Sequence, residues 1–158
     1  MPVEIPAGAP ATIGEAFAQI NAVSAPSIDQ HASALLPLLV GKPYKIALEP
    51  GRYIAGNSGV MLTRVLYRKQ GGQKRFVIVD AGMNDLIRPT LYDAYHAILP
   101  VKEPAEDASS ERVDVVGPVC ESGDIFAEQR PLPPISAGDL LAIGSVGAYG
   151  SVMSSSYN

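Results

Sequence analysis

Residues 60–79 read VMLTRVLYRKQGGQKRFVIV, and they determine the kind of fold to expect. Two runs rich in aliphatic and β-branched residues, 60–68 and 75–79, are joined by the segment QGGQ at residues 70–73. This pattern predicts an antiparallel β-hairpin. Basic residues flank the turn, and we interpret them as a solvated hairpin edge rather than as an anion-binding site.

Further β-rich runs follow the hairpin at residues 113–119, 125–127 and 140–143. Gly, Pro and Asp separate them, which is typical of a small β-barrel or sandwich. Before these runs, residues 85–97 are expected to form a helix or helical turns, with Pro89 tolerated near the start.

Upstream of the hairpin the pattern becomes helical. Ser27 and Gln30 form a capping box, and apolar residues follow at helical spacing. Pro37 should kink or shorten this helix, and Gly41 should end it. Residues 44–48 then read as a short buried strand, so that helix and strand together look like half of a βα unit.

The composition limits the choice of fold. Fifteen Gly and 14 Pro among 158 residues exceed the usual combined share of about 12%, which disfavours a helical bundle. A hydrophobic fraction of 47% is enough for a packed core. The length is too short for a complete (β/α)8 barrel, which needs about 250 residues.

Charge and cysteine content limit the choice of partners. The net charge of −4 disfavours nucleic-acid binding. The uncharged residues 140–158 contain too many Gly and Ser for a membrane span. The single cysteine excludes an internal disulfide and, without a Cys/His cluster, a structural zinc site, so no metal is expected. With no signal-peptide pattern, we expect a cytoplasmic protein.

Two stretches place anion-binding residues in loops. In EPGR (residues 49–52), the backbone of Gly51 can approach an anion closely, and Arg52 can hold a carboxylate or phosphate; a plain turn with a surface arginine is the alternative. In DAGMNDLIRPTLY (residues 80–92), Arg88 and Tyr92 share one helical face and can grip one anionic group, unless the helix is simply an exposed amphipathic one.

Two further stretches carry a thiol and an aromatic ring. GPVCESGD (residues 117–124) places Cys120 beside Glu121 on a turn, and a thiol that is mostly protonated at neutral pH can donate a proton to a carbanion; a buried small hydrophobe is the alternative. In GAYG (residues 147–150), Tyr149 either reaches a ligand or fills an apolar gap.

In this order, the four stretches resemble the diaminopimelate decarboxylase family, pyridoxal-phosphate enzymes of the alanine-racemase-like fold type. The resemblance runs through EPGRYI (49–54), DAGMNDLIRPTLYDAYH (80–96), GPVCESGD and GAYGSVMSSSYN (147–158). It implies decarboxylation of meso-diaminopimelate to L-lysine with pyridoxal 5'-phosphate as cofactor.

The resemblance also implies roles for individual residues. Cys120 would be the proton donor. In a homodimer, Cys120 and Glu121 would serve the active site of the partner subunit. The implied cofactor contacts are Glu49, Pro50, Gly51, Arg52 and Tyr149. The implied substrate contacts are Arg52, Arg88, Tyr92, Glu121 and Tyr149.

The chain departs from the family pattern in ways that predict a fragment. Its five lysines lie in the wrong contexts for the Schiff-base lysine, and neither His31 nor His96 matches the family's ring-stacking histidine. We therefore expect an α+β fragment, inactive alone. Residues 27–58 would be the last helix and strand of a (β/α)8 barrel, and residues 59–158 a mainly antiparallel β-barrel or sandwich domain truncated at its end.

We do not match residues 1–26 to the family pattern, although Thr12 and Glu15 form a second capping box. Two alternatives to the main function stay open. In the first alternative, the chain is part of a related ornithine, arginine or carboxynorspermidine decarboxylase. In the second, it is a non-catalytic β-domain that binds a full-length homologue. The Ile87-Arg88-Pro89 context and the CES triplet favour diaminopimelate as the substrate.

Overall fold

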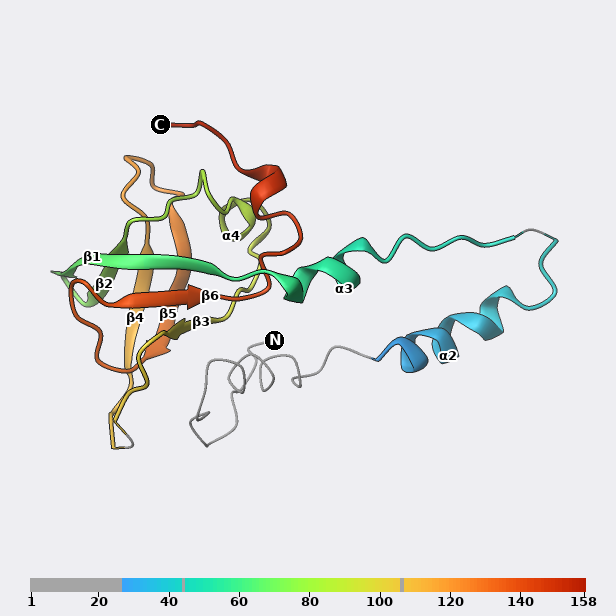
Figure 1. Ribbon diagram of the computed structural model, residues 1–158, viewed down its shortest axis with the longest axis horizontal. Helices are drawn as coiled ribbons and strands as arrows, with labels where there is room; N and C mark the ends of the chain where they lie inside the picture. Colours follow the sequence, from blue (N-terminus) through green and yellow to red (C-terminus); the bar gives the residue numbers. More distant parts are fainter. Residues whose placement is uncertain (1–26, 44, 106) are drawn as a thin grey trace. The chain divides into compact units, whose positions relative to one another are not determined.

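The computed structural model describes residues 27–43, 45–105 and 107–158 (Figure 1). The chain divides into two compact units, Met1–Pro50 and Gly51–Asn158. The predicted capping box at Thr12 and Glu15 lies outside the described residues. In the described part of the chain, no helix has the length and apolar character needed to cross a membrane.

The first unit contains the helix α2 (Ile28–Leu39). Its capping box is confirmed: the Gln30 backbone N–H donates to Ser27 Oγ at 3.2 Å, and the Ser27 N–H donates to Gln30 Oε1 at 2.8 Å. Pro37 lies inside the helix, and Gly41 follows its end with φ of +77°. No residue of α2 is buried.

The predicted strand at residues 44–48 is wrong for residues 45–48, which form no strand and are exposed. Tyr44 lies outside the described residues. A strand requires a neighbour that accepts and donates its backbone hydrogen bonds, and residues 27–50, apart from Tyr44, contain no other strand.

The second unit begins with two short helical segments and continues as a sheet domain. Its elements are α3 (Gly51–Ala55), η1 (Gly56–Ser58), β1 (Met61–Gly71), β2 (Lys74–Val79), α4 (Arg88–Tyr92), β3 (Ile98–Pro100), β4 (Glu111–Val116), β5 (Ile125–Leu132), β6 (Leu140–Ile143) and η2 (Ser151–Met153). The expected helix at 85–97 is thus a single turn, and β3 was not expected.

The six strands form one sheet in the order β3-β6-β1-β2-β4-β5. The predicted hairpin is confirmed as the antiparallel pair β1 and β2, with Gly71 opposite Lys74. All other pairs are antiparallel except β2 with β4. The long β1 pairs with β6 through its first half and with β2 through its second, so it joins the two halves of the sheet (Figure 1).

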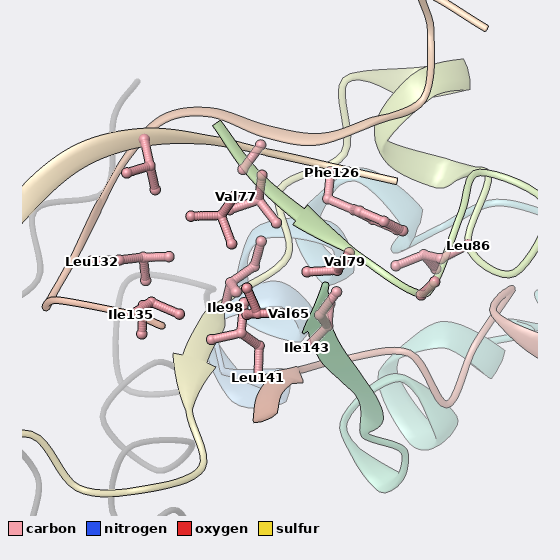
Figure 2. Close-up of a cluster of buried hydrophobic side chains, with 14 residues drawn as sticks. Val65, Val77, Val79, Leu86, Ile98, Phe126, Leu132, Ile135, Leu141 and Ile143 are labelled. Atoms are coloured by element: carbon pink, nitrogen blue, oxygen red, sulfur yellow. The ribbon is translucent and has the colours of Figure 1, made fainter. Parts of the chain in front are cut away.

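The inner face of the sheet holds a continuous apolar core (Figure 2). Aliphatic side chains from neighbouring strands pack there, with Leu86 from the loop after β2 beside them. The fully buried ones include Val65, Val79, Val115, Leu141 and Ile143. The loops at one end of the sheet are attached to the strands that form this core.

Three basic residues of the hairpin are paired with acidic residues of the neighbouring strands. Arg68 and Arg75 both bind the carboxylate of Glu111. Lys74 Nζ lies 2.9 Å from Asp114 Oδ2 and 3.0 Å from Glu128 Oε1. The hydrogen bond and charge of Asp114, followed by those of Glu128, raise the pKa of Lys74. The basic side chains are exposed to solvent, as expected. The interpretation as a hairpin edge is nevertheless wrong, because β1 and β2 lie in the middle of the sheet and β2 also pairs with β4.

Candidate functional site

The single-turn helix α4 carries Arg88 and Tyr92, one turn apart as the sequence predicted. Pro89 stands in the first turn, where its missing N–H costs nothing. Asp93 ends the helix with φ of +50°. The hydroxyl of Thr90 donates to the carbonyl of Gly123 at 2.6 Å, which fastens α4 to the turn between β4 and β5.

That turn, residues 117–124, carries Cys120 and Glu121 at the surface. The Gly123 N–H donates to Glu121 Oε1 at 3.3 Å and the Ser122 hydroxyl at 3.2 Å. These donors, with the Gly123 N–H contributing most, hold the pKa of Glu121 below its usual value. Glu121 is therefore an exposed, ionised carboxylate at neutral pH.

Asp124 holds the loops together from inside. Its side chain is buried, and its two carboxylate oxygens accept the N–H groups of Met83 and Val119, each at 2.7 Å. Burial raises the pKa of Asp124, because the loss of hydration destabilises the ionised carboxylate more than the two N–H groups stabilise it. A Cβ on Gly117 would overlap the Asp124 carboxylate, which explains the glycine there. The carboxylate thus fixes the loop after β2 against the Cys120 turn.

The loop after β2 is also anchored where it begins. Asp80 Oδ1 accepts the buried Thr63 hydroxyl at 2.7 Å and the Arg64 N–H at 2.8 Å. The Arg64 N–H, followed by the Thr63 hydroxyl, holds the pKa of Asp80 below its usual value. The loop therefore leaves the sheet at a fixed point on β1.

Tyr149 lies in the loop after β6 and has φ of +62°, an uncommon conformation for a residue with a side chain. The guanidinium carbon of Arg88 lies 5.9 Å from the centre of its ring, which is within cation–π distance. The ring is about half exposed. Arg88 and Tyr149 therefore present one cation and one aromatic face side by side.

The Tyr149 loop is fastened to the segment that follows Arg52. The N–H of Gly147 donates to the Gly56 carbonyl at 3.0 Å, and the Ser145 hydroxyl to Asn57 Oδ1 at 2.8 Å. A Cβ on Gly147 would overlap the backbone there. Arg52 is in α3, directly before this segment, and is exposed.

The C-terminal residues reach the same end of the sheet as α4 (Figure 1). The Ser155 N–H donates to the Asn84 carbonyl at 2.9 Å, and the Tyr157 hydroxyl lies 3.5 Å from Glu121 Oε2. Four of the predicted site residues thus lie in loops that hydrogen bonds or direct contact connect, namely Arg88, Tyr92, Glu121 and Tyr149.

The other predicted site residues are placed differently. Cys120 shares the turn of Glu121, with its thiol exposed. Gly51 and Arg52 begin α3. Glu49 and Pro50 end the first unit and are exposed.

Two residues at this site escaped the sequence analysis. Asp124 is the last residue of the GPVCESGD motif, and nothing local in the sequence indicates that it binds Met83, 41 positions away. His96 does not match the family's ring-stacking histidine, so the resemblance implies no role for it. It is 1% exposed and lies 3.4 Å, through Nε2, from Nη1 of Arg88. Its position at the end of DAYH, eight residues after Arg88, was the available signal.

The chain is similar to several known proteins. The family described as "Pyridoxal-dependent decarboxylase, C-terminal sheet domain" matches residues 21–147. The diaminopimelate decarboxylase of Aquifex aeolicus is 48% identical over 133 residues, covering 84% of this chain and 31% of the relative. That of Helicobacter pylori is 52% identical over 128 residues, covering 81% and 31%.

A solved structure extends the similarity to three dimensions. The Helicobacter pylori diaminopimelate decarboxylase complexed with L-lysine superposes with a TM-score of 0.73 at 49% identity, over 85% of this chain and 33% of that one. The chain therefore spans about a third of the length of the relatives it matches.

Proposed function

The chain belongs to the pyridoxal-dependent decarboxylases, whose C-terminal sheet domain it contains, and we propose that it forms the substrate-recognition part of a diaminopimelate decarboxylase. The observation that carries this proposal is that one end of the sheet presents a cation and an anion that no other described charge neutralises, so each is free to bind a ligand. Arg88 and Glu121 lie on α4 and on the turn that Thr90 joins to it, and neither forms an ion pair with another described residue.

The two charges match the distal end of meso-diaminopimelate, which carries both a carboxylate and an ammonium group. Arg88 would bind the carboxylate, because a guanidinium can donate two parallel hydrogen bonds to it. Tyr92, one helical turn away, would add a hydroxyl. Glu121 of the partner subunit, ionised at neutral pH, would bind the ammonium group. Identity of about half to diaminopimelate decarboxylases supports this substrate over related basic amino acids.

Gly51 and Arg52 would hold the phosphate group of pyridoxal 5'-phosphate. A Cβ on Gly51 would meet no other atom within 4 Å, so the space at the start of α3 is open for the phosphate, and Arg52 follows with a cationic side chain. Tyr149 would contact both cofactor and substrate. Glu49 and Pro50 would complete the loop. When bound, the cofactor supplies an electron sink for the charge released by decarboxylation.

The lysine that binds this cofactor covalently would come from outside the chain. Among the five lysines, Lys74 is held by Asp114 and Glu128, and its raised pKa makes it a poor amine nucleophile. Lys42, Lys45, Lys69 and Lys102 lie outside the loops that carry Arg88, Glu121 and Tyr149.

Cys120 would hold the proton that is delivered to the substrate carbon after carbon dioxide leaves. Its thiol is exposed at the tip of the turn, so it can reach into a site on another chain. We therefore propose a homodimer in which Cys120 and Glu121 complete the partner's active site. The same exposure would leave the thiol unused if the chain stayed a monomer.

The test is to complete the enzyme. The full 158-residue chain, coexpressed with the remaining two thirds of the Aquifex aeolicus decarboxylase, should form a complex that releases carbon dioxide from meso-diaminopimelate. An assembled complex that binds cofactor and yet releases none would refute the proposal.

Two controls separate the alternatives. Cys120→Ala should lower the rate of product formation with little change in folding, and unchanged kinetics would remove Cys120 from its role. Faster turnover of ornithine or arginine than of meso-diaminopimelate would favour a related decarboxylase. Binding to an intact homologue without turnover in the completed complex would favour a non-catalytic domain.

A further inference from the structure

His96 is a buried imidazole in which both ring nitrogens have partners. It stands between α4 and β3 and is 1% exposed. Its Nδ1 lies 2.9 Å from the carbonyl oxygen of Gly144, and its Nε2 lies 3.4 Å from Nη1 of Arg88. The ring therefore bridges the helix of Arg88 and the start of the loop that carries Tyr149.

The chemistry of the two partners determines where the proton is. A carbonyl oxygen can only accept, so Nδ1 carries the hydrogen that is donated to Gly144. A guanidinium can only donate, so Nε2 must present its lone pair to Arg88. Burial lowers the pKa of His96, and the positive charges of Arg88 and Arg130 lower it further, against the opposite effect of the Gly144 carbonyl. The ring is thus neutral at neutral pH.

A neutral acceptor has a specific consequence for Arg88. An Asp or Glu at this position would hold the guanidinium in an ion pair and compete with any anionic ligand. The imidazole instead occupies one of the five N–H donors of Arg88 and leaves its positive charge uncompensated. No described carboxylate forms an ion pair with Arg88.

His96 also fixes Arg88 relative to Tyr149. The Gly144 carbonyl that accepts the Nδ1 hydrogen lies five residues before Tyr149, and the Tyr149 ring lies 5.9 Å from Arg88 Cζ. A change in the ring would shift both residues at once.

We propose that His96 is a positioning residue that, as a neutral acceptor, orients Arg88 to bind a carboxylate of the substrate. The inference rests on the proposed function, which supplies that carboxylate. The competing explanation is a core histidine whose two hydrogen bonds serve stability alone.

The first test needs neither substrate nor cofactor. Nitrogen-15 NMR of the full chain, labelled at its two histidines and assigned with a His31→Asn variant, should show His96 protonated at Nδ1 and unprotonated at Nε2 at pH 7. Protonation at Nε2, or at both nitrogens, would overturn the proposal.

The second test uses the completed enzyme and two variants that separate the hydrogen bonds. His96→Gln can place an amide oxygen near the position of Nε2, whereas His96→Asn is too short to reach Arg88. Losing the oriented guanidinium should raise KM for meso-diaminopimelate about tenfold in His96→Asn with little change in kcat. In His96→Gln, KM should stay close to that of the unmodified enzyme. Equal KM values for the two variants would contradict a positioning role.

A double-mutant cycle with Arg88→Ala distinguishes an effect on Arg88 from a general loss of stability. Once Arg88 is absent, His96→Asn should raise KM no further, because its effect acts through the guanidinium. Additive losses would show a structural role only. If the unmodified completed enzyme releases no carbon dioxide, the proposed function fails, while the NMR result still decides the state of His96.

Discussion

Replacing Asp124 by Ala should be the most damaging single truncation at the loops of the site. The carboxylate is 3% exposed and accepts the N–H groups of Met83 and Val119, each at 2.7 Å. The substitution leaves both backbone donors without their partner, at a cost of about 1–3 kcal/mol each. Because removing a buried charge offsets part of this, we expect a net loss of about 2–4 kcal/mol.

Urea unfolding of the full chain measures this loss. With an m-value of about 2 kcal/mol/M, the midpoint should fall by about 1–2 M at unchanged m. Glu128→Ala is the matched control, because it removes an exposed carboxylate whose ion pair with Lys74 is screened by solvent and contributes little to stability. If Asp124→Ala shifts the midpoint no more than Glu128→Ala does, Asp124 does not hold the loops together.

The pH dependence gives an independent check on the same residue. Because burial raises the pKa of Asp124 in the folded state, its stabilising contribution is full below the unfolded pKa of about 3.9. It declines as pH rises through the folded value. Asp124→Asn cannot ionise, so its deficit relative to the unmodified chain should shrink as pH rises above about 4. A deficit that grows with pH would refute the assignment of the shift to burial.

Three further predictions follow from other contacts. Gly117→Ala should destabilise the chain by about 1–3 kcal/mol, because the new Cβ overlaps Asp124; an unchanged melting temperature would show that the loop can move aside. Glu111→Ala should lower the free energy of unfolding by less than about 2 kcal/mol, since it breaks two partly exposed ion pairs. In 1 M salt, most of the difference from the unmodified chain should disappear. A loss of stability that persists in salt would contradict this explanation. Because the folded-state pKa of His96 is lowered, its stabilising contribution is present above about pH 6.5 and is lost as pH falls toward that folded-state pKa. Between pH 7 and pH 5, the urea midpoint should therefore fall less in His96→Asn than in the unmodified chain. Equal slopes of midpoint against pH in the two proteins would contradict this prediction.

Local sequence patterns predicted the elements whose causes are local. The capping box of α2 depends on Ser27 and Gln30 alone, and the hairpin on alternation around a glycine turn. Both are confirmed. The predicted strand at 44–48 failed for residues 45–48, because an apolar run becomes a strand only where another strand pairs with it. The three-residue β3 was missed for the converse reason: its partner β6 lies more than 40 residues away.

The contacts that position the predicted site residues could not be predicted from the sequence. The motifs identified Arg88, Glu121 and Tyr149 as chemically useful, and the structure places them in connected loops. The residues that connect these loops, Asp124 and His96, bind backbone groups and a side chain that are distant in sequence. No periodicity or spacing encodes such contacts, so they appear only once the chain is folded.

The structure also separates two kinds of charge that look alike in the sequence. Arg68 and Arg75 of the hairpin share the carboxylate of Glu111, so their charge is already compensated and serves the sheet. Arg88 is instead held by a neutral imidazole and an aromatic ring. A protein that needed Arg88 only for stability would gain more from a carboxylate partner than from these two. The arrangement is therefore better explained by a cation reserved for a ligand, which is why replacing His96 should change KM rather than stability alone.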